Sequence, residues 1–199
     1  MIEAVLFDLG NVILEVDFRR TFARWAESAG VEVSHLHERW SMDEAYCAHE
    51  TGNLEFEDYV RHLTESLSIS MPLAHWEAGW NDVFVGPFPA VQARLGELAG
   101  TVPLFAFTNT NPTHVDAWRS RYFDTALYHF EEIFISSTMG MRKPDTLAYE
   151  WVADAMSLAP REILFLDDTL ENIEGAAAVG MQTEWIRSEA DVLRALRPF

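Results

Sequence analysis

The chain has 199 residues and a formal charge of −18, from 32 acidic against 14 basic residues. This length fits one domain, or one domain with an insertion, and 49% hydrophobic residues suffice to bury a core. The acidic balance argues against phosphate backbones and anionic membrane surfaces as partners, because clustered Lys and Arg bind such polyanions. We therefore expect neither a nucleic acid nor a membrane as a partner.

The chain's only cysteine is Cys47, which excludes an intrachain disulfide and favours a reducing compartment. The N-terminal segment carries acids where a signal peptide carries basic residues. No apolar run approaches the roughly 18 residues that span a bilayer. We expect a cytoplasmic protein.

Short apolar runs predict the strands of a buried parallel sheet. They cover residues 4–7, 103–107, 133–135, 163–166 and 183–186. Helical patterns lie between the later runs, at residues 115–121, 146–158 and 170–179. This alternation predicts an α/β fold with a doubly wound, Rossmann-like parallel sheet, in which ligands bind beyond the carboxyl ends of the strands.

Residues 17–87 interrupt this alternation with a helical period throughout. In residues 55–67, for example, the apolar side chains recur on one helical face. We expect an all-helical cap at 17–87, inserted into an α/β core formed by 1–16 and 88–199. Because the insertion follows the first strand, the cap would lie over the carboxyl edge of the sheet and could act as a lid.

Acidic residues follow two of the predicted strands. Asp8 comes directly after the first run, where a carboxylate can be a nucleophile, a metal ligand or an ordinary turn residue. Asp167 and Asp168 come directly after the run at 163–166, and two adjacent acids repel one another unless a cation lies near them. A metal site and a surface turn are both open for this pair.

Thr108 and Asn109 follow another strand and offer neutral donors suited to phosphoryl oxygens, although both residue types also make turns. Lys143 is the only lysine in a chain with 13 arginines. The scarcity of lysine argues against the interpretation of Lys143 as an ordinary solvated surface charge. A lysine is a compact charge that can bridge a carboxylate and a phosphoryl oxygen.

Together these residues resemble the haloacid dehalogenase-like hydrolase superfamily, most of whose members are magnesium-dependent phosphatases. The insertion is similar to the helical cap of the branch in which the cap follows the first motif. Within that branch, the first and last motifs look most similar to those of bacterial α-D-glucose-1-phosphate phosphatases. The matching segments, in the family's order and at its spacing, are residues 7–12, 107–109, 140–145 and 165–176.

The resemblance implies a small phosphorylated metabolite as substrate and a reaction at Asp8. Asp8 would attack phosphorus and form an aspartyl-phosphate. Thr108 and the backbone of Asn109 would hold phosphoryl oxygens. Lys143 would neutralise charge on both the phosphoryl group and Asp8.

The resemblance also implies a Mg²⁺ cofactor. Its ligands would be Asp8, the Gly10 carbonyl and Asp168, while Asp167 and Asn172 would lie just outside the ligand set. Hard oxygen ligands of this kind suit Mg²⁺.

Gly10 departs from the family pattern, since phosphatases of the family usually carry an Asp there as general acid and base. A general acid is worth about 10²–10⁴-fold in rate. Its absence suits a leaving group that needs little protonation, so we hypothesise a sugar 1-phosphate, whose anomeric hydroxyl is unusually acidic. Asp17 is a distant candidate for a replacement acid.

Two other functions remain open. A haloacid dehalogenase would not need the missing acid, because halide leaves without a proton, although Asp167 and Asp168 would then have no purpose. A non-catalytic or very slow phosphometabolite-binding protein would also tolerate Gly10, although it would have less need of Asp8 and Lys143. The sequence does not indicate the oligomeric state.

The role of the cap aromatics is also open. Trp76 and Trp80 lie four residues apart, and with Trp40, Tyr46, His49 and Glu50 they could form a wall for a sugar. Paired aromatic residues at helical spacing belong more often to a core.

Overall fold

The computed structural model describes all 199 residues and contains a five-stranded parallel sheet with the order β5-β4-β1-β6-β7. This confirms the predicted doubly wound α/β fold. The five predicted strands are all present within a residue or two of their expected bounds. They are β1 (Ala4–Phe7), β4 (Leu104–Thr108), β5 (Glu132–Ile135), β6 (Ile163–Asp167) and β7 (Gln182–Trp185).

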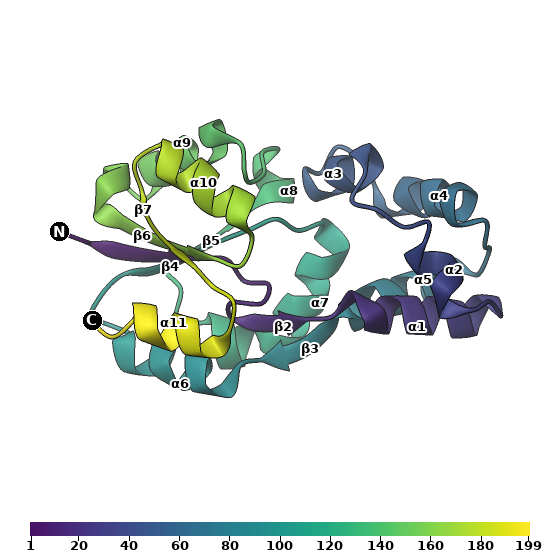
Figure 1. The fold of residues 1–199 in the computed structure, drawn as a ribbon, viewed down its shortest axis with the longest axis horizontal. Helices are drawn as coiled ribbons and strands as arrows, with labels where there is room; N and C mark the ends of the chain where they lie inside the picture. The colour runs from purple at the N-terminus through teal and green to yellow at the C-terminus, as the bar shows by residue number, and fades with distance from the viewer.

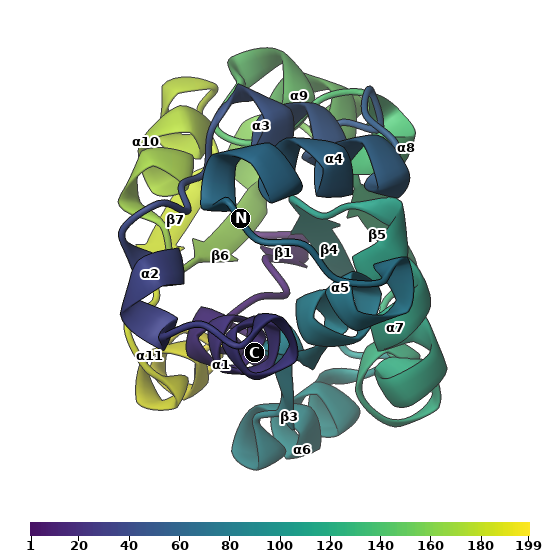
Figure 2. The same cartoon turned by 90° about the vertical axis from the view of Figure 1, so that its right-hand side faces the viewer.

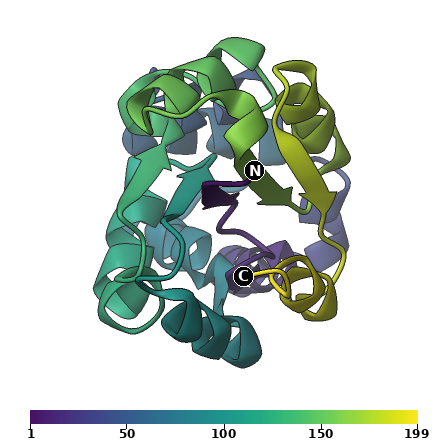
Figure 3. The ribbon, with the colours of Figure 1, turned by 90° about the vertical axis from the view of Figure 1, so that its left-hand side faces the viewer.

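Helices cover both faces of this sheet (Figure 3). Because successive side chains of a strand point to opposite faces, Val5 and Phe7 of β1 join one apolar core while Ala4 and Leu6 join the other. Helices α6 (Pro89–Leu98), α7 (Pro112–Tyr122) and α11 (Glu189–Ala195) pack into the first core. Helices α9 (Thr146–Ala155) and α10 (Leu170–Ala178) pack into the second.

Five helices gather at one end of the molecule, away from both termini (Figure 1). Viewed from that end, they lie in front of the sheet (Figure 2). They share a third apolar core, rich in tryptophan, that contains Trp25, Trp76 and Trp80. The five are α1 (Phe18–Ala29), α2 (Val33–His37), α3 (Glu44–Glu50), α4 (Phe56–Leu67) and α5 (Leu73–Trp80).

A short antiparallel ribbon joins this helical end to the sheet (Figure 1). It consists of β2 (Leu14–Val16) and β3 (Phe84–Pro87), in which Leu14 pairs with Pro87. The prediction of helical structure throughout 17–87 is therefore wrong at β3. Two strands of three and four residues are too short to give a clear alternating pattern, so periodicity does not reveal them.

The remaining short elements complete the connections, and no helix is both long enough and apolar enough to cross a membrane. These elements are η1 (Asn81–Val83), η2 (Phe123–Leu127), α8 (Ser136–Met139) and η3 (Pro160–Glu162).

The close packing of α1 against α5 makes Gly79 sensitive to substitution. A Cβ atom at Gly79 would overlap the buried indole ring of Trp25. We expect Gly79→Ala to lower the free energy of unfolding by about 1–3 kcal/mol, as overpacking does.

The matched control is Gly96→Ala in α6, where a Cβ atom would meet only ordinary contacts, the nearest at 3.6 Å from His129. Helix propensity predicts a gain of roughly 0.5–1 kcal/mol for this variant. Urea unfolding of both variants checks the pair, and equal stability of the two would contradict the packing argument.

Candidate active site

Three chemically important side chains project from adjacent strand ends. Phe7 in β1 pairs with Ala106 in β4 on one side and with Leu166 in β6 on the other. Strand β1 ends at Phe7, β4 ends at Thr108 and β6 ends at Asp167, so Asp8, Thr108 and Asp167 meet at one edge of the sheet. The order of strands reverses at β1, and this is the position where doubly wound sheets bind ligands.

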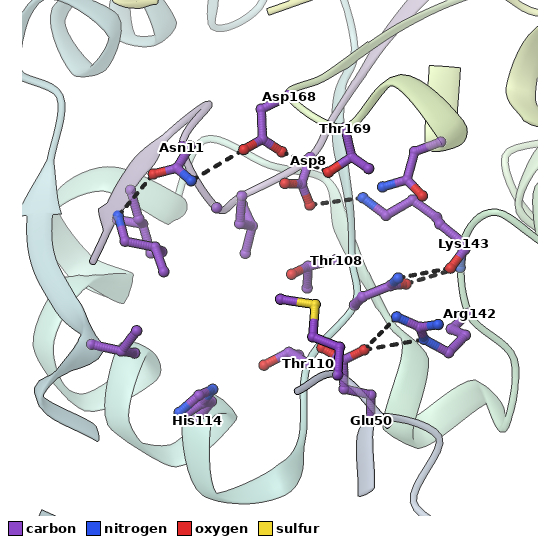
Figure 4. Close-up of a pocket in the computed structure, with 18 of the residues that line it drawn as sticks. Asp8, Asn11, Glu50, Thr108, Thr110, His114, Arg142, Lys143, Asp168 and Thr169 are labelled. Atoms are coloured by element: carbon purple, nitrogen blue, oxygen red, sulfur yellow. Dashed lines mark hydrogen bonds and ion pairs between the residues drawn. The ribbon is translucent and has the colours of Figure 1, made fainter. Parts of the chain in front are cut away.

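Lys143 connects the acids at this edge. Its Nζ atom donates to Asp8 Oδ1 at 2.7 Å and to Asp167 Oδ2 at 2.6 Å (Figure 4 shows the first of these contacts). The lysine is 1% exposed, and its ammonium lies 5.3 Å and 5.4 Å from the ring centres of Phe107 and Phe165. The only lysine is therefore a fully desolvated charge with two carboxylate partners.

Asp167 is completely buried and already satisfied by protein groups. Besides Lys143, it accepts from the Asn172 amide at 3.0 Å and 3.1 Å and from the Thr169 backbone at 2.8 Å. These bonds occupy both of its oxygens. Asp167 thus orients Lys143 and has little capacity left for a ligand.

Asp168 faces the pocket and is held from two directions. Its Oδ2 atom accepts from Asn11 Nδ2 at 3.1 Å, and its backbone carbonyl accepts from the Trp185 indole at 2.9 Å. Asn11 also accepts from the Val16 backbone at 3.1 Å, which ties the Asp168 carboxylate to β2. Asn11 has a φ of 54°, a left-handed conformation that Asn tolerates better than most residues.

The carboxylates of Asp8, Asp167 and Asp168 form a cluster whose ligand atoms lie within 4.8 Å of one another. With all three ionised and Lys143 protonated, the cluster has a net charge of −2, which a divalent cation would balance. Because Asp167 is occupied, Asp8 and Asp168 are the two acids open to a metal. Oxygen donors of this kind fit Mg²⁺ better than softer metals.

Gly10, Thr108 and Asn109 line the same pocket as Asp8, Lys143 and Asp168, so the structure brings all six predicted site residues together. The Asn109 side chain has a further contact that the sequence did not reveal. Its amide donates to the Lys143 carbonyl and accepts from the Lys143 backbone N–H, both at 2.9 Å. Asn109 thereby fixes the loop that carries the lysine.

The pocket has a volume of about 410 Å³ and lies between the sheet edge and the five-helix end of the molecule (Figure 4). Tyr46 and Glu50 from α3 contribute to its lining. Trp76 and Trp80 do not, and both are buried in the tryptophan-rich core. The core interpretation of this pair is therefore correct, while Tyr46 and Glu50 reach the pocket.

Arg142, directly before Lys143, makes a contact that sequence reasoning missed. Its guanidinium donates to Glu50 Oε2 at 2.8 Å and 3.1 Å, which joins the lysine loop to α3. Next to this pair, Ser136 Oγ donates to the Glu50 carbonyl at 2.6 Å. Burial raises the pKa of Glu50, and Arg142 opposes the shift. An Arg directly before the only lysine and an acid within residues 17–87 were the only sequence signals.

Asp17 and His114 are two candidates for a general acid in place of Gly10, and neither fits this role. Asp17 caps α1, pairs with Arg19 at 2.8 Å and does not line the pocket. His114 does line it, but burial lowers the pKa of His114 to about 3, so the ring is neutral at pH 7. The His114 Nε2 atom also lies 3.1 Å from the Trp80 carbonyl, which engages it within the protein.

Comparison with known proteins identifies the family. The model of the haloacid dehalogenase-like hydrolase family matches residues 2–180. The chain belongs to this family. It is 27% identical to a sesquiterpene phosphatase of Aspergillus oryzae over 90% of this chain and 87% of the relative. It is 22% identical to a D-ribitol-5-phosphate phosphatase of Bacteroides thetaiotaomicron over 96% and 95% of the two chains.

A solved structure shows the same fold. The family enzyme of Bacteroides thetaiotaomicron in its magnesium complex superposes with a TM-score of 0.87, at 22% identity and with 98% of each chain covered. The predicted membership in the haloacid dehalogenase-like hydrolases is thus confirmed, and so is the hydrolase class.

The charge balance of the cluster predicts that the free energy of unfolding of the metal-free protein falls as Asp8 ionises. Burial raises the pKa of Asp8 to about 7, against the opposing charge of Lys143. A carboxyl whose pKa is higher in the folded state than in the unfolded state stabilises the fold at pH values below its unfolded-state pKa, here near 3.8. This contribution is lost as the pH rises through its folded-state pKa of about 7. In EDTA, we expect Asp8→Asn to match the wild type near pH 4 and to exceed its unfolding free energy at pH 8 by about 2–4 kcal/mol.

Asp17→Asn provides the matched control with the opposite sign. Arg19 lowers the pKa of Asp17, so this carboxylate stabilises the fold at high pH and its removal should not raise stability at pH 8. Urea unfolding at both pH values measures the difference. A lower free energy of unfolding for Asp8→Asn than for the wild type at pH 8 would show that ionised Asp8 does not destabilise the fold.

Proposed function

We propose that the protein is a Mg²⁺-dependent phosphatase that hydrolyses a small phosphomonoester through an aspartyl-phosphate on Asp8. The observation that carries this proposal is the arrangement of Asp8, which accepts from Lys143 at 2.7 Å and lies beside Asp168 in the pocket. Two relatives that span most of the chain, the sesquiterpene phosphatase and the D-ribitol-5-phosphate phosphatase, are named for very different organic groups. Their shared chemistry therefore supports phosphate removal and leaves the organic group open.

In the proposed reaction, a carboxylate oxygen of Asp8 attacks phosphorus and the bond to the ester oxygen breaks. The leaving alkoxide or phenoxide takes its proton from solvent. Water then attacks the same phosphorus, the bond to Asp8 breaks, and inorganic phosphate leaves with the Asp8 carboxylate restored. Lys143 stays in place throughout and offsets negative charge on Asp8 and on the phosphoryl oxygens, which is the main requirement of phosphoryl transfer.

The other site residues position the phosphoryl group and the metal. Thr108 and the Asn109 backbone would hold phosphoryl oxygens at the end of β4. Asp8, Asp168 and the Gly10 carbonyl would hold Mg²⁺. When bound, the ion supplies Lewis-acid stabilisation of the phosphoryl charge.

We further propose that residues 17–87 act as a cap over a core formed by 1–16 and 88–199. The five helices share their own apolar core, and the β2–β3 ribbon joins them to the sheet. The Glu50–Arg142 ion pair then joins the cap to the loop that carries Lys143.

The glycine at position 10 favours substrates whose leaving group is already acidic. Neither Glu50 nor Asp17 is placed to replace the missing acid, since Glu50 is engaged by Arg142 and Asp17 lies outside the pocket. A sugar 1-phosphate satisfies this acidity requirement and stays a candidate substrate, and aryl phosphates satisfy it as well.

Phosphate release from a panel of phosphomonoesters tests the proposed function. We expect release that requires Mg²⁺ and falls at least about a thousandfold in Asp8→Asn, since the amide cannot form the covalent intermediate. Asp17→Asn is the control and should keep wild-type rates. A protein that binds the esters without releasing phosphate would be a sensor, and chloride release from a 2-haloacid would indicate a dehalogenase.

Substitution at Gly10 tests the role of the missing acid. A Cβ atom there would lie 3.7 Å from Asp8 Oδ2 and from Val16, so the position has room for a side chain. We expect Gly10→Asp to raise kcat for a hexose 6-phosphate at least tenfold, a part of the roughly 10²–10⁴-fold that a well-placed general acid supplies, and to change aryl phosphate hydrolysis much less.

Gly10→Asn is the matched control, because it has the same shape without an acidic proton. Equal rates for the two variants on a hexose 6-phosphate would contradict the leaving-group argument. So would a wild-type enzyme that hydrolyses hexose 6-phosphates as fast as 1-phosphates.

A further inference from the structure

We propose that the pocket selects phosphomonoesters whose organic group is apolar, an alkyl or aryl group without a set of hydroxyls. This inference rests on the proposed phosphatase function and names the substrate class of the same site. It is carried by the contrast between the two ends of the pocket, one of which is charged while the other is apolar.

The apolar part of the pocket comes from three different segments. The β2–β3 ribbon together with Val83, which directly precedes β3, the residue that begins α1 and the middle of α7 all contribute apolar or aromatic side chains. These side chains are Leu14, Val16, Phe18, Val83, Phe84 and Trp118. Four of the six also belong to the apolar core beneath the sheet, and the other two pack against it, so this wall is a rigid continuation of the core.

Three of the larger polar groups beyond the phosphoryl end already have partners within the protein. Arg142 and Glu50 are bonded to each other at 2.8 Å and 3.1 Å. Of the two His114 nitrogens, Nε2 lies 3.1 Å from the Trp80 carbonyl and Nδ1 lies 3.2 Å from the Asn111 amide. Arg142, Glu50 and His114 are therefore less available to the hydroxyls of a polyol.

This arrangement has opposite consequences for the two substrate classes. A hydroxyl that leaves water for an apolar wall loses hydrogen bonds that the wall does not replace. A methylene or an aromatic edge in the same position gains from its removal from water. The volume of about 410 Å³ lies in the lower half of the range for small-ligand pockets, so the organic group is small.

A matched pair of substrates tests the inference without interference from leaving-group acidity. Cyclohexylmethyl phosphate and glucose 6-phosphate both carry a six-membered ring next to a primary phosphate ester, and they differ chiefly in the ring hydroxyls. We expect kcat/KM to be at least about tenfold higher for cyclohexylmethyl phosphate, the scale of discrimination that apolar pockets achieve. An equal or lower value would overturn the inference.

Substitution of the wall provides a second test. Val16→Thr places a hydroxyl on the wall with little change in volume, and we expect it to raise KM for cyclohexylmethyl phosphate by roughly three- to tenfold with kcat nearly unchanged. Val85→Thr is the control, because Val85 lies on the same ribbon, is 43% exposed and does not line the pocket. Equal KM values for the two variants would contradict a role of the wall in binding.

The two proposals fail in different ways. If the protein releases phosphate from glucose 6-phosphate faster than from the apolar ester, the phosphatase function stands and the substrate class is wrong. If no ester of either class releases phosphate, the phosphatase function itself is wrong.

Discussion

The buried contact of Lys143 with Asp8 and Asp167 is the interaction on which the rest of the site depends. Removing Lys143 would leave the carboxylates of Asp8 and Asp167 without their counter-charge, and such a loss in a buried cluster commonly costs several kcal/mol. Asp167 therefore has a clear purpose although it is closed to ligands, because it holds the ammonium where Asp8 needs it. The compact ammonium reaches both carboxylates between two aromatic rings, a space that the wider and planar guanidinium of Arg would not fill in the same way.

The loop that carries this lysine also connects the two ends of the molecule. Asn109 fixes its backbone from β4, while Arg142 reaches Glu50 on α3. The same few residues thus contact the sheet edge, the Asp8 carboxylate and the five-helix end. A displacement of α3 would reach Lys143 through its immediate neighbour Arg142, so the position of α3 and the placement of the ammonium are linked.

The sequence predicted the sheet and the charged end of the pocket because both depend on local signals. Buried strands give apolar runs, and parallel strands bring the residues after them to one edge, so Asp8, Thr108 and Asp168 could be placed together without coordinates. The β2–β3 ribbon was missed because two strands of three and four residues give no periodicity. The Arg142–Glu50 pair was missed because its members lie 92 residues apart, and only the folded chain brings them together.

The charge of the site explains how a strongly acidic protein could bind a phosphate ester. The positive charge of Lys143 is shared between two aspartates, and that of Arg142 is balanced by Glu50, so neither cation gives the pocket a net positive charge. With its acids ionised, the Asp8, Asp167, Asp168 and Lys143 cluster is negative by two charges and would repel the ester. A divalent cation would neutralise the cluster while the formal charge of −18 over the whole chain barely changes. In the proposed reaction, the metal would therefore remove the electrostatic barrier to binding of the ester.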